Sequence, residues 1–336
     1  MSRFVNLALF VLVVALTITG AAALVWSEAS WLFEAHRIAG WALVVLTPLK
    51  VAIAWRSYRR GAGPPLGRSL AITASSLAAG LTILVAALAF AWMWRLGPDT
   101  LALAGRVDTL MSWHWILGFV LFPLFLAHSW ITWPRPRRSD LVSRRAFLRL
   151  AGLGAAAVAG WAAGGIVAAR RDRSDAPRRA SGSRRAGSFA GNDFPVTTGA
   201  GDGREPVDQA AWRLTIDGRR LRRVSIDYAG FLDLPTTVVE ATLDCTIGWY
   251  TEQHWRGVAL VDLLRRAGSP AAAWVRVTAA GGYRHVFSPR EAERLVLATH
   301  VGDEPLSHAH GFPVRLVAPG RKGWFWVKWV ERIEAL

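Results

Sequence analysis

Cysteine is nearly absent from this 336-residue sequence, which contains one, Cys245. A single thiol cannot form a disulfide within the chain, so disulfide bonds contribute nothing to its stability in any compartment. Without further context, an isolated cysteine is most often a small buried apolar residue. The residues around Cys245 therefore decide whether it has a chemical role.

Acidic residues are also scarce, with 24 Asp and Glu against 40 Lys and Arg and a net charge of +16. So basic a chain first suggests nucleic-acid binding. The arginines, however, gather in three clusters at 56–68, 135–149 and 170–185. The first two flank long apolar runs, where basic loops set the orientation of a membrane protein, and the third lies in a polar linker. We therefore expect a membrane, and not nucleic acid, as partner.

Long apolar runs dominate residues 1–169, whereas the remainder has the composition of a soluble domain. Four runs are near the ~20 residues that a membrane-spanning helix needs. They are Phe4–Val25, His36–Trp55, Leu70–Trp94 and Trp113–Trp133. A fifth run, Leu150–Ala169, is weaker because it is mostly Ala and Gly. The sequence thus predicts an all-α transmembrane four-helix bundle over 1–134 and a further membrane segment within 135–169.

The basic residues of the loops indicate how these helices cross the membrane. Arg3 and the clusters at 56–68 and 135–149 fall on one side, against Arg37, Arg95 and Arg106 on the other. The side rich in arginine is cytoplasmic. We expect a cytoplasmic N-terminus, with the second and fourth helices running from outside to inside.

Ser143–Arg149 (SRRAFLR) precedes the fifth run and resembles a twin-arginine export signal, although it is internal. The mild hydrophobicity of the following run suits this export route, which carries folded proteins. The linker at 170–191 is as basic as the loop before the fifth run, so charge alone does not decide the last crossing. The motif leads us to expect a multi-pass protein of the cytoplasmic membrane whose C-terminal domain is extracytoplasmic.

Three histidines lie in the expected spans, where ionisable residues are costly and are functional candidates. His36 and His114 stand at the outer ends of the second and fourth helices. His128 follows His114 by fourteen residues, nearly four helical turns or ~21 Å along one face. Gly40 and Gly118 come one turn after the first two histidines, where a porphyrin edge can approach the backbone.

Facing imidazoles from two helices can supply both axial ligands of a low-spin b-type heme. This half resembles the four-helix cytochrome b-type membrane subunits of bacterial respiratory enzymes, which implies heme b with His36 and His114 as iron ligands. It departs from that pattern at Lys50, which stands where a second pair needs a histidine. Lys50 is also explained by snorkelling to the headgroups. We favour one heme over two, with His128 as the candidate for the second.

The C-terminal residues 192–336 mix short apolar runs with glycine-containing turns, which predicts an α+β, mostly β domain. A short helix is expected at Leu260–Ala267. Strands are expected at Trp212–Ile216, Val238–Leu243, Trp274–Thr278, Phe312–Ala318 and Trp324–Val330.

Two motifs stand out in this half. His310–Gly320 (HGFPVRLVAPG) is followed by Val327-Lys328-Trp329, and Leu243–Trp249 (LDCTIGW) by Trp255–Val258 (WRGV). The first resembles the C-terminal signature of the sulfite oxidase family molybdopterin domain, and the second resembles the loop that presents the molybdenum cysteine in its bacterial members. The resemblance extends from Phe194-Pro195-Val196 over nearly all of 192–336.

The resemblance implies a molybdenum–molybdopterin cofactor with Cys245 as the catalytic thiolate ligand. A cysteine on a turn between strands can reach a metal without bringing bulk into the pocket. The same resemblance implies two further groups of cofactor-binding residues. His310 and Arg315 would bind the pterin phosphate and its surroundings, and Trp326, Val327 and Lys328 would line the cofactor. A strand with aromatic packing explains the latter three equally well.

Two departures bear on the substrate. Phe325 stands where sulfite oxidases carry an arginine, and Thr197 and Thr198 follow Phe194 in place of their arginine-bearing motif. Sulfite is therefore not the expected substrate. The pattern is nearer to the bacterial group that includes periplasmic reductases of sulfoxides.

These features predict a membrane-anchored molybdopterin-dependent oxidoreductase. It would exchange electrons, with oxygen-atom transfer, between a small extracytoplasmic substrate and the quinone pool through heme b. Two alternatives stay open: a degenerate molybdopterin-fold binding module on a membrane anchor, and the same enzyme facing the cytoplasm. The joint presence of Cys245, His310 and Arg315 argues against the first.

Overall fold

The computed structural model of the chain forms two compact units. The helical unit comprises Met1–Val25, Ala29–Asp175 and Ala180–Gly182. The C-terminal unit comprises Trp26–Glu28, Ala176–Arg179 and Ser183–Leu336. The structure describes residues 2–59, 65–103, 106–132, 143–172, 176, 178–197, 207–218, 221–269 and 274–336. Thr198 and the arginines at 135, 137 and 138 lie outside the described residues.

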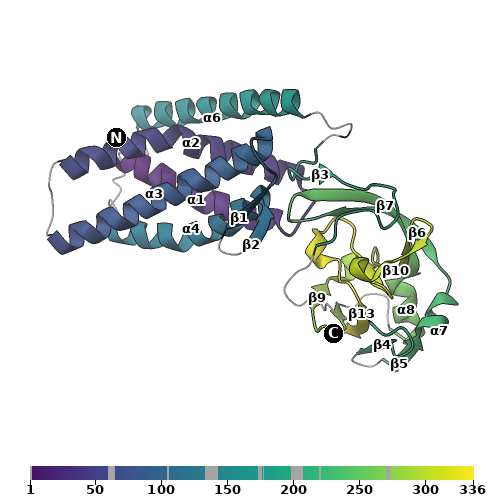
Figure 1. Cartoon of the computed structure of the whole chain (residues 1–336). Helices are drawn as coiled ribbons and strands as arrows, with labels where there is room; N and C mark the ends of the chain where they lie inside the picture. The colour runs from purple at the N-terminus through teal and green to yellow at the C-terminus, as the bar shows by residue number, and fades with distance from the viewer. Residues whose placement is uncertain are drawn as a thin grey trace. The chain divides into compact units, whose positions relative to one another are not determined.

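The helical unit is built from helices that run alongside one another in Figure 1. They are α1 (Ser2–Ala23), α2 (Ser30–Arg59), α3 (Pro65–Trp94), α4 (Leu110–Thr132) and α6 (Arg144–Arg171). Helix α1 packs on α2, α3 on α4, and α6 on α2. In the described part of the chain these five helices are long and apolar enough to cross a membrane. The five apolar runs therefore form helices, while the crossing and its orientation stay predictions.

Helix α6 joins this unit through two glycines on one face. A Cβ atom at Gly160 or Gly164 would lie 2.6 or 2.8 Å from the Trp41 ring, so only glycine lets the ring approach. The indole N–H of Trp94 donates to the Gly164 carbonyl at 3.1 Å. At the start of the helix, the Ser143 hydroxyl caps the first turn by accepting an amide hydrogen bond at 3.1 Å. The weakest apolar run is therefore a packed helix of the unit.

A short hairpin interrupts the helices, so the all-α prediction for 1–134 is wrong between α3 and α4. Strand β1 (Thr100–Leu103) pairs antiparallel with β2 (Arg106–Thr109). The Trp113 indole on α4 donates to the Leu101 carbonyl at 2.8 Å and ties the hairpin to that helix. Strand β1 has only four residues, all of them exposed, and is too short for a pattern of apolar residues to predict it.

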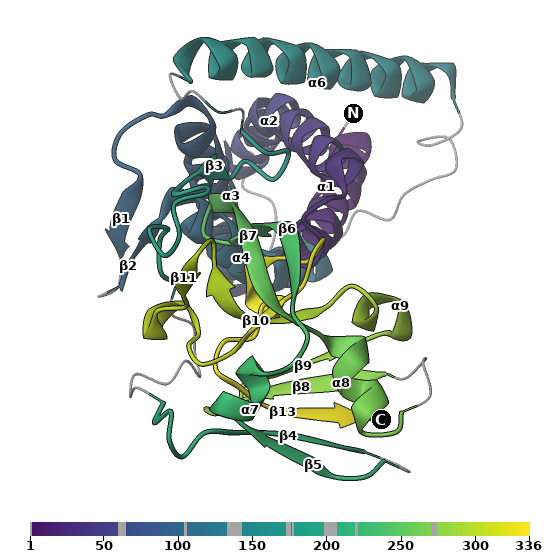
Figure 2. The same cartoon turned by 90° about the vertical axis from the view of Figure 1, so that its right-hand side faces the viewer.

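The C-terminal unit contains two sheets. In the first sheet the strands follow the order β11-β10-β7-β3; in addition, β12 pairs with β10 and β6 pairs with β7. In the second sheet the order is β5-β4-β13-β8-β9, and these strands lie side by side in Figure 2. The first sheet contains β3 (Arg184–Arg185), β6 (Thr237–Asp244), β7 (Trp249–Ala259), β10 (Val296–Val301), β11 (Glu304–Pro305) and β12 (Arg315–Val317). The second contains β4 (Arg213–Gly218), β5 (Val224–Asp227), β8 (Val275–Ala279), β9 (Arg284–Phe287) and β13 (Val330–Ala335).

Short helices connect these strands, namely α7 (Tyr228–Leu232), α8 (Leu260–Arg266), α9 (Pro289–Ala292) and the 3₁₀ helices η1 (His308–His310) and η2 (Gly323–Phe325). Alternate residues of the strands point into one apolar core, as Leu214 and Ile216 do on β4. The α+β, mostly β prediction is confirmed, because β4, β6, β8 and α8 form where the periodicity placed them.

The C-terminal unit differs from the sequence prediction in three respects. The predicted strand Trp324–Val330 is wrong: η2 occupies its start, Trp329 has a φ of 53° outside the β region, and β13 begins only at Val330. The sequence prediction contains none of the strands β5, β7, β9, β10 and β11. The predicted linker at 170–191 contains β3, which pairs in parallel with the start of β7.

Candidate functional site

Cys245 lies on the tight turn between β6 and β7. Its N–H donates to the Trp249 carbonyl at 2.8 Å, and the Gly248 N–H donates to the Cys245 carbonyl at 3.2 Å. Gly248 has a φ of 103°, a conformation that favours glycine and explains its place in the motif. Cys245 and Trp249 therefore face each other across the turn.

The Cys245 sulfur is buried and lies 3.2 Å from the Thr197 hydroxyl oxygen. Lys328 holds Thr197 in place by donating from Nζ to its carbonyl at 2.9 Å. Burial raises the pKa of the Cys245 thiol, while the Ile247 backbone N–H, the Thr197 hydroxyl and the Lys322 charge favour the thiolate. A bound metal cation would also favour the thiolate, because the thiolate is the form of cysteine that ligates metals.

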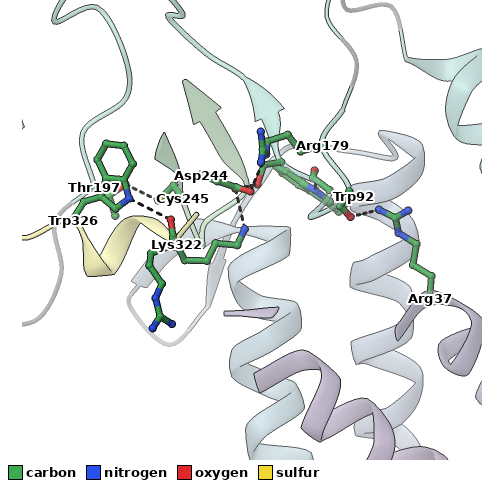
Figure 3. A network of polar contacts seen from close by, with 12 residues as sticks. Arg37, Trp92, Arg179, Thr197, Asp244, Cys245, Lys322 and Trp326 are labelled. Atoms are coloured by element: carbon green, nitrogen blue, oxygen red, sulfur yellow. Dashed lines mark hydrogen bonds and ion pairs between the residues drawn. The ribbon is translucent and has the colours of Figure 1, made fainter. Parts of the chain in front are cut away.

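A buried charged network adjoins this sulfur. The Asp244 carboxylate, which is fully buried, accepts hydrogen bonds from the Ser183 hydroxyl at 2.6 Å and from Lys322 Nζ at 2.9 Å. Arg179 lies 3.3 Å from its second oxygen, and Figure 3 shows both cations directed at this carboxylate. The network connects the residue before Cys245 to two distant segments of the chain.

His310 and Arg315 form a second group. His310 Nε2 donates to the Phe194 carbonyl at 3.0 Å, and its Nδ1 lies 2.8 Å from the Ser307 hydroxyl. Burial lowers the pKa of His310 to about 4, so the ring is neutral at pH 7, with one donor and one acceptor nitrogen. Both nitrogens thus have protein partners, and His310 anchors the segment that leads to Thr197. Its contact with a pterin phosphate stays a prediction.

Arg315 is buried between aromatic rings. Its guanidinium donates to the His310 carbonyl at 2.9 Å and lies 5.7 and 5.9 Å from the ring centres of Trp255 and Trp326. Trp326 is itself buried, and its indole N–H donates to the Arg321 carbonyl at 3.2 Å. The Val327 carbonyl accepts a hydrogen bond at 2.8 Å from the N–H of Leu316 in β12, so the backbone at Val327 is bound to that strand.

The structure therefore joins the predicted residues into two connected groups. In the first group, Cys245 and Lys328 both contact Thr197. In the second group, Arg315 contacts both His310 and Trp326. Sequence reasoning missed Asp244 and Lys322 as a pair. Asp244 could have been identified from the sequence because it lies inside the cysteine motif, whereas no local sequence pattern distinguishes Lys322.

These residues fit a metal cofactor that brings most of its own ligands. Among the described residues, no group of three or more His, Cys, Asp or Glu side chains could hold a metal ion. Cys245 offers one thiolate, and the cations Lys322, Lys328 and Arg315 suit an anionic cofactor. Molybdopterin supplies a dithiolene and carries a phosphate, so it matches this donor set.

In the helical unit, the His36 ring on α2 and the His114 ring on α4 make a T-shaped edge contact, with ring centres 6.1 Å apart and an angle of 87° between the ring planes. The Nδ1 atoms lie 2.9 Å from the Thr19 hydroxyl and 2.9 Å from the Val85 carbonyl. Histidines that ligate a metal through Nε2 commonly have such a partner at the other nitrogen.

His128 has different surroundings. It is buried on α4, and its Nδ1 lies 3.2 Å from the Ser75 hydroxyl. Lys50, which occupies the position of a second ligand in the sequence pattern, donates from Nζ to the Asn6 side chain at 2.7 Å. This hydrogen bond gives Lys50 a structural role and favours one histidine pair over two.

Comparison with known proteins bears on the C-terminal unit. Residues 202–336 match the family described as oxidoreductase molybdopterin binding domain. The chain is 28% identical over 145 residues to the uncharacterized oxidoreductase YuiH of Bacillus subtilis, covering 42% of this chain and 73% of that protein. It is 28% identical over 181 residues to the sulfite oxidase of Gallus gallus, covering 43% of this chain and 37% of that protein.

Two further similarities also cover only part of each protein. The nitrate reductase [NAD(P)H] of Hordeum vulgare is 40% identical over 94 residues, which are 24% of this chain and 10% of that protein. The crystal structure of the sulfane dehydrogenase SoxCD from Paracoccus pantotrophus aligns with a TM-score of 0.37 and 26% identity over 40% of each chain. The family match and the sulfite oxidase and nitrate reductase relatives show that residues 202–336 are similar to the molybdopterin-binding domain of oxidoreductases of the sulfite oxidase and nitrate reductase type.

Proposed function

We propose that this chain is a membrane-anchored molybdopterin-dependent oxidoreductase. It exchanges electrons between a small extracytoplasmic substrate and the quinone pool through a b-type heme. The observation that carries the proposal is the buried Cys245 thiol, presented on a turn and hydrogen-bonded to Thr197 inside a molybdopterin-binding domain. When bound, the cofactor supplies two-electron redox chemistry with oxygen-atom transfer.

The residues of the chain position that chemistry. Cys245 supplies the protein ligand, and the Thr197 hydroxyl donates to its sulfur once the thiol has lost its proton. The Asp244–Lys322 pair holds the β6–β7 turn, and Gly323 approaches it so closely that an added Cβ would lie 3.4 Å from Cys245 Cα. Lys328 and Arg315 place positive charge near the site for an anionic pterin.

The substrate is proposed to be a small molecule other than sulfite. Thr197, beside the Cys245 sulfur, offers a neutral hydroxyl rather than a guanidinium. Phe325, which stands in place of another arginine, packs on His285 with ring centres 4.5 Å apart. A neutral oxygen donor or acceptor, such as a sulfoxide, suits this environment better than an anion does, because fewer cations are available to compensate its charge.

The heme and the membrane orientation are parts of the same proposal. The facing His36 and His114 side chains support one b-type heme, and a site with two histidine ligands suits electron transfer. The five apolar helices support a membrane anchor. A quinone of the membrane is the proposed electron-transfer partner of a heme held by these helices. The motif of Ser143–Arg149, which begins helix α6, supports export of the C-terminal unit.

Metal analysis and an optical spectrum of the purified full-length protein test this proposal. We expect about one molybdenum per chain, a pterin released on denaturation, and the absorbance of a reduced b-type heme. Absence of molybdenum from protein made in a cofactor-producing host would contradict the catalytic assignment. Molybdenum without heme absorbance would contradict only the electron-transfer part.

A further inference from the structure

Trp249 differs from the other buried tryptophans of the C-terminal unit. Four of these, among the described residues, donate their indole N–H to a backbone carbonyl at 2.8 to 3.2 Å, namely Trp212 to Val330, Trp255 to Ala241, Trp326 to Arg321 and Trp329 to His308. Trp249 is also buried, with 9% of its surface exposed, and its Nε1 is inaccessible to solvent. This N–H has no acceptor among the described residues.

A buried N–H without an acceptor is unusual, because folding removes its hydrogen bonds to water without replacing them. The tryptophan indole can only donate, so no rearrangement of its own proton relieves the loss. An acceptor on a bound ligand would account for the exception. The position of Trp249 then decides which ligand that is.

Trp249 lies at the metal site. It faces Cys245 across the β6–β7 turn, and directly opposed residues of an antiparallel pair place their side chains on the same face. Its ring centre lies 6.0 Å from that of Phe194, whose ring in turn lies 3.9 Å from His310. The indole thus lies beside the Cys245 turn and is connected through Phe194 to His310, which the sequence motif assigns to the cofactor.

We infer that Trp249 Nε1 donates a hydrogen bond to an oxygen or sulfur atom bound to the molybdenum. This inference rests on the proposed function, because it requires the cofactor at Cys245. The donor is neutral, so it stabilises an electron-rich ligand atom without adding charge to a site that already holds Lys328 and Arg315. Trp249 is accordingly a cofactor-binding residue.

Pulsed EPR of the full-length holoprotein tests the contact directly. The protein is labelled with tryptophan carrying ¹⁵N in the indole ring and is reduced to the paramagnetic Mo(V) state. We expect a weak ¹⁵N coupling to the metal in the wild-type protein that is lost in Trp249→Phe. The matched control is Trp255→Phe, which removes a buried indole that donates to Ala241 and should leave the coupling unchanged.

Cofactor-free full-length protein, made in a host unable to synthesise molybdopterin, provides the second measurement. Trp255→Phe should lower its thermal midpoint more than Trp249→Phe does, because only the former loses a hydrogen bond within the protein. An equal or larger loss in Trp249→Phe would show that this indole has a protein acceptor and would overturn the inference. So would a wild-type Mo(V) centre without ¹⁵N coupling, or a coupling that persists in Trp249→Phe. A protein without molybdenum would overturn the proposed function as well.

Discussion

Asp244 and Lys322 form an ion pair from which solvent is excluded on both sides, with 2.9 Å between Oδ1 and Nζ. The two residues also form a parallel backbone bridge. Together they attach the segment before η2 to the last residue of β6, next to Cys245. Removing one member leaves the other charge buried with fewer partners. This change lowers the free energy of unfolding far more than the loss of an exposed ion pair does.

Lys322→Met is therefore expected to destabilise the C-terminal unit by ~3–5 kcal/mol. The measurement is denaturant unfolding of the full-length protein, followed by hydrogen exchange at the β6 and β7 amides. The double variant Lys322→Met with Asp244→Leu should recover part of the loss, since no isolated charge remains. Arg332→Gln is the matched control, because its partly exposed pair with Asp217 contributes at most ~1 kcal/mol. Equal effects of Lys322→Met and Arg332→Gln would contradict the importance of the buried pair.

Cys245→Ser should abolish turnover while leaving the fold intact. A serine oxygen is a poorer ligand for this redox cycle than a thiolate, and the change in side-chain volume is small. Turnover with the natural electron donor and circular dichroism of the same preparation provide the two measurements. Wild-type activity in this variant would remove the basis for placing the metal at Cys245.

The Thr197 hydroxyl is expected to tune the reduction potential of the metal. Its hydrogen bond withdraws electron density from the Cys245 sulfur, so Thr197→Val should lower the Mo(VI)/Mo(V) potential by on the order of 50 mV, about a tenfold change in the equilibrium. Thr197→Ser keeps a hydroxyl and should restore the wild-type potential. Potentiometric titration monitored by EPR gives both values. A potential that does not move in Thr197→Val would show that the hydroxyl does not act on the sulfur.

The twin-arginine interpretation of Ser143–Arg149 predicts a strict requirement for paired guanidinium groups. Changing Arg144 and Arg145 together to lysine keeps the charge but should hold the C-terminal unit in the cytoplasm. A reporter fused after Leu336 measures its location. The control is Arg170 and Arg171 changed to lysine at the other end of helix α6. An extracytoplasmic reporter in the Arg144 and Arg145 variant would eliminate this export route.

Heme content distinguishes one histidine pair from two. His36→Ala or His114→Ala should each remove the whole b-type absorbance, because either change leaves the same iron with one axial ligand. His128→Ala should retain most of it, since Lys50 is engaged by Asn6. The heme-to-molybdenum ratio should be near one to one. Loss of half the absorbance in His128→Ala would reveal a second heme.

The candidate site shows which features can be predicted locally. Gly248 and Cys245 could be read from the motif because a tight turn imposes its own residue preferences, independent of the rest of the fold. Strands β4 and β8 could likewise be predicted because alternate burial leaves a period of two in the sequence. Strand β7 was missed because, although burial alternates over Thr251–Gly257, the buried positions include Thr251 and Gln253, so no alternation of apolar residues marks the strand in the sequence.

The sequence by itself determined that the chain has long apolar helices with facing histidine positions, and that Cys245 stands in a motif for a molybdenum site. Only the tertiary structure decided that Lys322 pairs with Asp244, that Thr197 reaches the Cys245 sulfur, and that the Trp249 indole finds no acceptor within the described part of the chain. Helix length, turn type and strand alternation depend on neighbouring residues, which a sequence displays directly. A hydrogen bond between distant segments depends on how the whole core packs, and no local pattern records that outcome.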